Sequence, residues 1–175
     1  MVIGWRSVPF APMASTVQPS LHPSIEPLAF LLGEWAGEGK GEYPTIQPFV
    51  YGEEIRFWHV GKPYLAYGHR TWNIETGAAM HFETGYWRLP AENLVEVVIA
   101  QPTGVAEVLE GTLDGGEISL RSSVISRTST AKEVTETTRR LAVTGDAMTC
   151  DASMAAVGQP LTHHLHSELL RAALP

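Results

Sequence analysis

The 175-residue sequence has a single cysteine, Cys150, few basic residues and no long hydrophobic run. One cysteine excludes an intramolecular disulfide and fits a reducing compartment, so we expect a cytoplasmic protein. Twelve Lys and Arg residues against 19 Asp and Glu give a net charge of −7 without any basic cluster, which argues against nucleic-acid binding. No apolar run approaches the roughly 20 residues that a membrane-spanning helix needs, so we expect no membrane partner.

Motifs for hydrolysis and for nucleotide binding are also missing. No GxSxG nucleophile elbow occurs. Glu53 and Glu54 are neighbours, and because an extended strand points them to opposite faces they cannot act as a pair. The glycine patterns of phosphate loops and of dinucleotide-binding loops both fail within Gly37–Glu42, where Gly41 replaces the required Ser or Thr and Glu42 replaces the required glycine.

The length and the apolar content of 44% suit one domain with a real core, because a chain of this size buries about 70% of its unfolded surface. Residues 1–24 are rich in Pro and Ser without any periodicity, so we expect a flexible leader followed by one domain over residues 25–175. Ile25–Leu32 is apolar and predicts one short helix that closes the mouth of the domain.

After residue 32 the sequence becomes a series of short alternating segments with turn residues between them. The strands expected from this pattern are Gly33–Ile46, Phe49–Val60, Tyr64–Trp72, Met80–Leu89, Leu94–Ala100, Val105–Gly111, Glu117–Ser126, Lys132–Val143 and Ala147–Val157. Asp114-Gly115-Gly116 and Thr144-Gly145-Asp146 are typical hairpin turns. The last segment, Leu161–Ala173, is ambiguous, because its leucines recur every four residues as in a helix.

About ten such strands predict an all-β fold, an antiparallel up-and-down barrel wide enough to hold one small ligand. Closure of the barrel also removes exposed strand edges, which would otherwise favour aggregation.

One face of the segment Gly33–Ile46 is unusual. Trp35 and Tyr43 enclose a row of three glycines there, while charged residues occupy the other face. A strand interior normally disfavours glycine, which packs nothing. Two interpretations remain open: a broad, flat ligand lies close to the backbone, or the strand is strongly bent at a barrel corner.

The same segment carries a family resemblance. The pattern GxWxGxG at Gly33, Trp35, Gly37 and Gly39, followed by Tyr43-Pro44-Thr45-Ile46, resembles the nitrobindin family, whose members are small β-barrels that hold haem b. The resemblance continues through ordered motifs over roughly residues 25–172. These motifs are Gln47-Pro48-Phe49, His59-Val60-Gly61-Lys62-Pro63, Glu83-Thr84-Gly85-Tyr86, Ala131-Lys132-Glu133, Gly158-Gln159-Pro160-Leu161 and His163-His164-Leu165.

The resemblance implies a lipocalin-like or fatty-acid-binding-protein-like barrel, with a final strand at Leu161–Ala173. It identifies His164 as the proximal haem ligand. The other residues that it places around the haem are Thr45, Lys132, His81, Gln101, Met154 and the glycine-face residues Gly33, Trp35, Gly37 and Gly39. Thr45 and Lys132 would hold the propionates, although a solvated barrel rim also explains Lys132. Met154 is equally explained as core filler. For His164, an unligated core residue remains the alternative to the haem ligand.

The residues alone do not choose His164 over its neighbours. His163, His164 and His166 are clustered, and on a regular strand His164 and His166 share a face with Glu168 beyond them. A zinc site built from these residues is the alternative, but it lacks a convincing fourth ligand.

The function implied by the resemblance is that of a ferric haem b protein that isomerises peroxynitrite to nitrate. Nitric oxide would bind at the same open axial position, since one histidine leaves the other side of the iron free. The partners are then these two small molecules, and we expect a monomer or a homodimer. Two rivals remain: a haem-free carrier of a fatty acid or another apolar ligand, and an interaction module whose barrel has lost its ligand.

Overall fold

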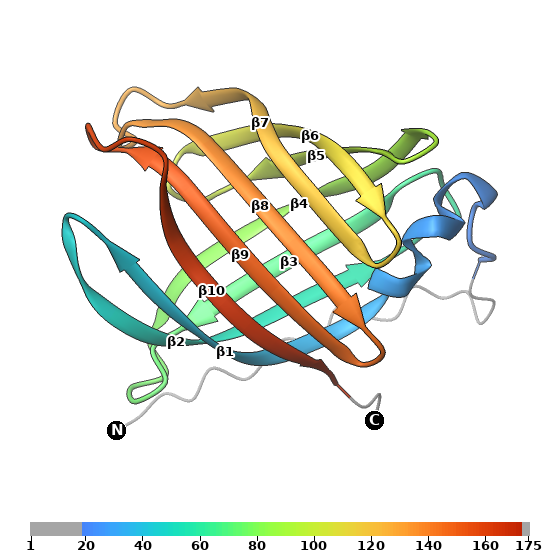
Figure 1. Cartoon of the computed structure of the whole chain (residues 1–175), viewed down its shortest axis with the longest axis horizontal. Coiled ribbons are helices and arrows are strands. Elements are labelled where there is room, and N and C mark those ends of the chain that lie inside the picture. Colours follow the sequence, from blue (N-terminus) through green and yellow to red (C-terminus); the bar gives the residue numbers. More distant parts are fainter. Residues whose placement is uncertain (1–18, 173–175) are drawn as a thin grey trace.

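Ten antiparallel strands close into one barrel in the computed structural model, which describes residues 19–172 (Figure 1). The 3₁₀ helix η1 (Pro23–Leu31) precedes the strands. Of the expected leader, residues 1–18 lie outside the described residues, while Pro23 and Ser24 already belong to the helix. No helix in the described part of the chain has the length and apolar character needed to cross a membrane.

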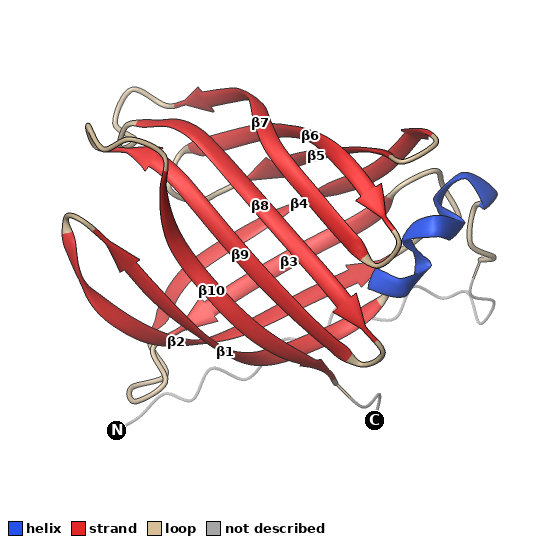
Figure 2. Cartoon of the chain, viewed as in Figure 1, coloured by secondary structure: helices blue, strands red, loops and turns tan. Residues whose placement is uncertain are grey.

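The predicted all-β barrel is therefore confirmed, and its elements follow one another along the chain as a meander (Figure 2). The strands are β1 (Gly33–Tyr43), β2 (Ile46–Trp58), β3 (Leu65–Trp72), β4 (Ala79–Ala91), β5 (Leu94–Ala100), β6 (Val105–Asp114), β7 (Glu117–Arg127), β8 (Val134–Thr144), β9 (Ala147–Ala156) and β10 (Thr162–Arg171). Gly115 and Gly145 have φ values of 58° and 60°, which the two-residue hairpin turns at these positions require.

The ambiguous last segment is a strand. β10 pairs with β9 on one side and with β1 on the other, from Trp35 opposite Arg171 to Gly41 opposite Leu165. This pairing closes the barrel, because without β10 both β1 and β9 would keep an unpaired edge. Barrel closure therefore outweighs the helical spacing of the leucines.

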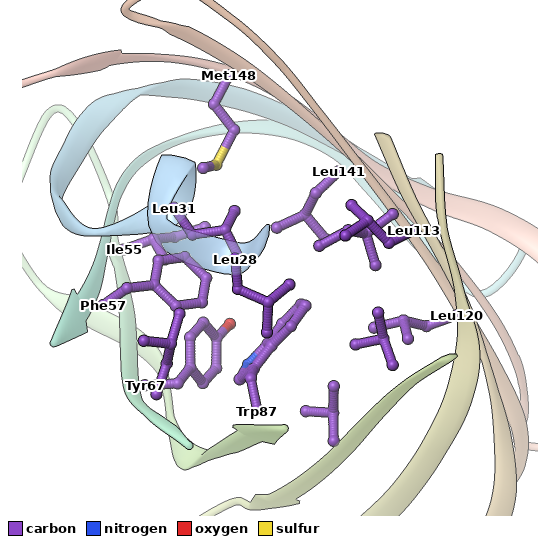
Figure 3. Packing of buried hydrophobic residues seen from close by; sticks show 14 of the residues in the cluster. Leu28, Leu31, Ile55, Phe57, Tyr67, Trp87, Leu113, Leu120, Leu141 and Met148 are labelled. Atoms are coloured by element: carbon purple, nitrogen blue, oxygen red, sulfur yellow. The ribbon is translucent and has the colours of Figure 1, made fainter. Parts of the chain in front are cut away.

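Helix η1 closes one end of the barrel. Ile25, Leu28 and Leu31 of the helix are completely buried, and Leu28 and Leu31 lie over a cluster that includes Phe57 and Trp87 (Figure 3). Each fully buried side chain of this kind contributes about 1.5–3 kcal/mol. The hydrophobic core therefore fills the helix end of the barrel, and the opposite end is left for a ligand site.

Candidate functional site

The barrel end away from η1 contains a cavity of about 920 Å³, a size typical of sites for small molecules and cofactors. Its rim includes Thr45 in the turn after β1, Thr103 in the loop before β6 and Lys132 in the loop before β8. Figure 1 shows the β1–β2 turn and helix η1 at opposite ends of the barrel. The rim side chains of Thr45 and Lys132 are exposed, so the cavity opens to solvent there.

Six of the predicted site residues line this one cavity although they are far apart in the sequence. They are Thr45 after β1, His81 in β4, Gln101 after β5, Lys132 before β8, Met154 in β9 and His164 in β10. The meander brings them together because every strand contributes one end to the same barrel opening.

The other four predicted residues, Gly33, Trp35, Gly37 and Gly39, are absent from the cavity lining. Trp35 lies at the helix end, where it is fully buried and its indole N–H donates to the carbonyl of Leu31 at 2.8 Å.

The row of glycines accommodates rings of the protein itself. A Cβ atom placed on Gly39 would lie 2.3 Å from the Tyr51 ring, and one on Gly41 would lie 2.2 Å from the Phe49 ring. Phe49 and Tyr51, both from β2, thus lie over the glycines and form the cavity wall there. A flat ligand in the cavity would contact these rings and not the bare backbone.

His164 enters the cavity through a β-bulge in β10. His163 pairs with Ser153 and Leu165 pairs with Ala152, so His164 is the extra residue between them. A bulge interrupts strict alternation and re-aims a side chain. Both His164 and Leu165 line the cavity as a result.

A second irregularity, in β1, provides the partner of this histidine. The register of β1 against β2 shifts between Gly41 and Tyr43, which leaves Glu42 without a partner on β2. The Glu42 carbonyl oxygen lies 2.9 Å from Nδ1 of His164. When the Nδ1–H donates to this carbonyl, Nε2 keeps its lone pair for a metal ion, as in most histidine ligands.

Aromatic rings fix the orientation of the imidazole. The Tyr43 ring meets it edge-on at 5.3 Å between centroids, and the Phe49 ring lies at 6.3 Å. Tyr43 is itself held by its hydroxyl, which donates to the Met154 carbonyl at 3.1 Å and accepts from the Ala156 N–H at 3.0 Å. Burial lowers the pKa of His164 below its ordinary value of 6.5, and the contact with Glu42 offsets this only in part. The imidazole is therefore neutral at pH 7.

Among the described residues, the C-terminal histidines are not part of a group close enough to hold one metal ion. His166 is not part of the cavity lining, and its Nδ1 lies 2.7 Å from a carboxylate oxygen of Asp151. The bulge at His164 is the physical reason, because it separates two side chains that a regular strand would place on one face.

A group of buried charged residues, which sequence reasoning did not single out, lies between the cavity and the hydrophobic core. We call this group the ionic floor; it consists of the buried residues Glu53, His69, Glu83 and Glu107 and the mostly buried Arg139, all of which also line the cavity. The alternation of inward and outward residues could have indicated all of these residues except Arg139. Each of the other four lies an even number of positions from a core residue of its own strand: Phe57, Tyr67, Trp87 or Leu109.

Glu83 is the centre of the ionic floor. Its side chain is 1% exposed, and the two terminal nitrogens of Arg139 lie 2.5 and 3.0 Å from its two oxygens. The Tyr67 hydroxyl donates to the same carboxylate at 2.7 Å, and Nε2 of His81 lies at 3.2 Å. Burial by itself would raise the pKa of Glu83, but Arg139 and the nearby histidines outweigh burial and hold the pKa well below its usual range.

His69 lies between two carboxylates. Its Nε2 is 2.7 Å from Glu53 and its Nδ1 is 3.3 Å from Glu83. Burial by itself would lower the pKa of this ring, yet the two carboxylates raise the pKa from 6.5 to about 9. Neither ring nitrogen has the geometry of a hydrogen bond, although both are buried.

The remaining carboxylate of the floor, Glu107, is fully engaged. Arg139 donates to one of its oxygens at 3.0 Å, Gln101 donates to the same oxygen at 2.5 Å, and Thr137 donates to the other. Gln101 therefore connects the cavity rim with the ionic floor.

These groups fit a haem. A neutral imidazole with an unused Nε2 enters the cavity beside aromatic and thioether side chains of Phe49 and Met154. Lys132 and Thr45 at the rim offer an ammonium and a hydroxyl to propionates. The carboxylates of the floor would repel propionates placed deep in the cavity. The edge of the haem that carries the propionates therefore fits the open rim better.

Comparisons with known proteins show which family the chain is similar to. Residues 24–171 match the model of a family described as the THAP4-like, heme-binding beta-barrel domain. A Mycobacterium marinum protein named peroxynitrite isomerase 2 is 48% identical over 155 residues, covering 86% of this chain and 96% of the relative. A Nocardia farcinica protein named peroxynitrite isomerase is 49% identical over 160 residues, covering 88% and 95%.

A solved structure extends the likeness to three dimensions. The crystal structure of Rv2717c from M. tuberculosis superposes with a TM-score of 0.83 at 43% identity, covering 88% of this chain and all of that one. The family model spans most of the sequence, and it includes all the described strands. The chain therefore belongs to the family of THAP4-like, heme-binding β-barrel domains, the nitrobindin family that its sequence motifs resemble.

Proposed function

We propose that this protein binds haem b through Nε2 of His164, keeps it in the ferric state and isomerises peroxynitrite to nitrate. The iron held by His164 would also bind nitric oxide. The observation that carries the proposal is the bulged His164, which enters a cavity with Nδ1 engaged by the Glu42 carbonyl. The two relatives named peroxynitrite isomerase support the choice of reaction.

The residues of this chain have distinct roles in the proposed function. His164 anchors the group as a neutral ligand, and Tyr43 and the Glu42 carbonyl keep its ring oriented. Lys132 and Thr45 bind the propionates at the rim. When bound, the haem would supply a Lewis-acidic iron to which peroxynitrite could bind.

The cavity walls and floor control where a small anion can go. Apolar side chains such as Phe49 and Met154 exclude water, which limits side reactions. Among residues 19–172, the counterions of the three floor carboxylates are Arg139 and the His69 ring, so the remaining negative charge repels an anion from the deep cavity.

The rival function, carriage of a fatty acid, lacks support from the same residues. A buried fatty-acid carboxylate needs a free cation, because an unpaired buried charge is costly. Arg139 is the arginine of the cavity floor, and Glu83 and Glu107 already pair with it. A fatty-acid head group would have to displace one of them.

Stopped-flow mixing of peroxynitrite with the haem-loaded protein tests the proposal. We expect faster decay, with nitrate as the product, than in buffer. His164→Ala should reduce the acceleration at least about tenfold, a loss of about 1.4 kcal/mol in transition-state stabilisation. His166→Ala, which changes a histidine outside the cavity, should leave it intact. Equal decay with and without the haem-loaded wild-type protein would contradict the proposed activity.

A further inference from the structure

Three side chains on the cavity floor form a group with the composition of a metal site. Nitrogen atoms of His69 and His81 and a carboxylate oxygen of Glu83 all lie within 4.8 Å of one another. The residues come from the neighbouring strands β3 and β4, which hold them in a fixed register. Two imidazoles and one carboxylate are the donor set of many zinc and non-haem iron sites.

The distances between the donor atoms suit one metal ion. Nδ1 of His69 lies 3.3 Å from one oxygen of Glu83, and Nε2 of His81 lies 3.2 Å from the other. Donor atoms bound at about 2.1 Å to a tetrahedral ion are about 3.4 Å apart. The group therefore needs only a small rearrangement to bind a metal.

The surroundings of His69 provide an independent observation. The ring is more than nine-tenths buried, yet neither nitrogen makes a hydrogen bond, and Oε2 of Glu53 is also buried without a partner. Buried polar groups are normally satisfied, so such a combination needs an explanation. Oε1 of Glu53 lies 2.7 Å from Nε2 of His69, which places a carboxylate behind the imidazole as in carboxylate–histidine–zinc arrangements.

The formal charges of the ionic floor also leave room for a dication. Glu53, Glu83 and Glu107 carry three negative charges and Arg139 carries one positive charge, so these four side chains, counted without the histidines, have 3 − 1, or two, negative charges in excess. Within residues 19–172, no other lysine or arginine forms an ion pair with these carboxylates. One divalent cation balances this charge.

The geometry points to a second metal site, in which His69, His81 and Glu83 bind one divalent first-row transition metal such as Zn²⁺ or Fe²⁺ on the cavity floor. Glu53 orients His69 from behind. The ion shares Glu83 with Arg139, and the open side of the ion faces the cavity. The site uses neither His164 nor the rim residues Thr45 and Lys132, although its ligand His81 is one of the residues that the family resemblance places around the haem.

Metal titration of the full chain tests this site. The haem-free protein is stripped with a chelator, dialysed, and titrated with Zn²⁺ against a chromophoric chelator and with Co²⁺ by visible absorption. We expect one equivalent of either ion, with the visible bands of Co²⁺ bound to nitrogen and oxygen.

Variants identify the residues that bind the ion. Because His81 is half-buried, His81→Ala should fold, and we expect it to weaken Zn²⁺ binding at least about tenfold. Glu53→Gln, a second variant that touches no proposed ligand atom, should weaken binding by about 10–100-fold. The controls are His164→Ala and the double variant His163→Ala/His166→Ala, which should keep wild-type affinity. Circular dichroism checks that each variant is folded.

Two results would overturn the inference. The first is no saturable binding of Zn²⁺ or Co²⁺ by folded wild-type protein. The second is binding that survives in His81→Ala and Glu53→Gln but is lost in a control, because that pattern would assign the ion to the C-terminal histidines or to His164.

Discussion

Replacing Glu83 by glutamine should destabilise the barrel strongly, although the two side chains have nearly the same shape. Both oxygens of Glu83 face donors: Tyr67 and Arg139 at Oε1, Arg139 and His81 at Oε2. Whichever way the amide is turned, its NH₂ group opposes a donor. The substitution also removes a negative charge that pairs with a mostly buried guanidinium.

The size of the effect follows from burial. Breaking a buried ion pair by removing one partner costs about 3–5 kcal/mol, which is a large part of the 5–15 kcal/mol that stabilises a typical domain. In Glu83→Gln, Arg139 still pairs with Glu107, so we expect a loss near the lower end of the 3–5 kcal/mol range. Glu54→Gln is a matched control, because Glu54 pairs with Arg70 at 2.6 Å on the exposed side of β2. Exposed pairs contribute about 0–1 kcal/mol.

Urea unfolding of the chelator-treated protein at pH 7, followed by tryptophan fluorescence, measures both variants. With a slope of about 2 kcal/mol per molar urea, Glu83→Gln should lower the midpoint by about 1.5–2 M, and Glu54→Gln by less than about 0.5 M. Equal, small shifts in both variants would refute the reasoning, because they would mean that the contacts of Glu83 stabilise the fold no more than an exposed pair does.

Three further predictions concern other parts of the barrel. Gly39→Ala should lower the free energy of unfolding, measured in urea, by about 1–3 kcal/mol, because the added Cβ would overlap the Tyr51 ring. The control Gly68→Ala should leave it unchanged, because the Cβ added there meets no atom closer than 3.7 Å. Two carboxylates raise the folded-state pKa of His69 to about 9, so its stabilising contribution is complete below pH 6.5 and is lost as the pH rises through 9. The melting temperature should fall over that window, and fall less in His69→Gln. Burial raises the pKa of the Cys150 thiol, so iodoacetamide should alkylate it slowly at pH 8 until urea is added; rapid labelling of the native protein would contradict this.

The strand pattern and turn residues predict most of the fold. Alternation marks the outward face of Gly33–Tyr43 and the inward face that the structure buries, and hairpin residues such as Gly115 and Gly145 mark the strand ends. The identity of β10 is not predictable from spacing, because it depends on barrel closure, which only the complete set of strands determines.

The candidate site is predictable from the sequence only in part. Family motifs identify residues on the cavity rim, but periodicity cannot place His164, since the bulge that turns it inward is invisible in a pattern of period two. The role of the glycine row could not be predicted from the sequence either, because the rings that pack against it, Phe49 and Tyr51, belong to the next strand.

The ionic floor shows what an amphipathic pattern conceals. Glu83 and Glu107 occupy inward positions at which a pattern search expects apolar side chains, and their counterion Arg139 comes from β8. Only the three-dimensional barrel reveals that Arg139 pairs with both of these carboxylates.

The central claim, that a neutral His164 holds a haem in the open end of the barrel, is tested most directly by titrating haemin into the full-length protein and recording the Soret band. We predict saturation at one haemin per chain in the wild type and in His166→Ala, and loss or marked weakening of the band in His164→Ala. An unchanged, saturable Soret band in folded His164→Ala would contradict the account.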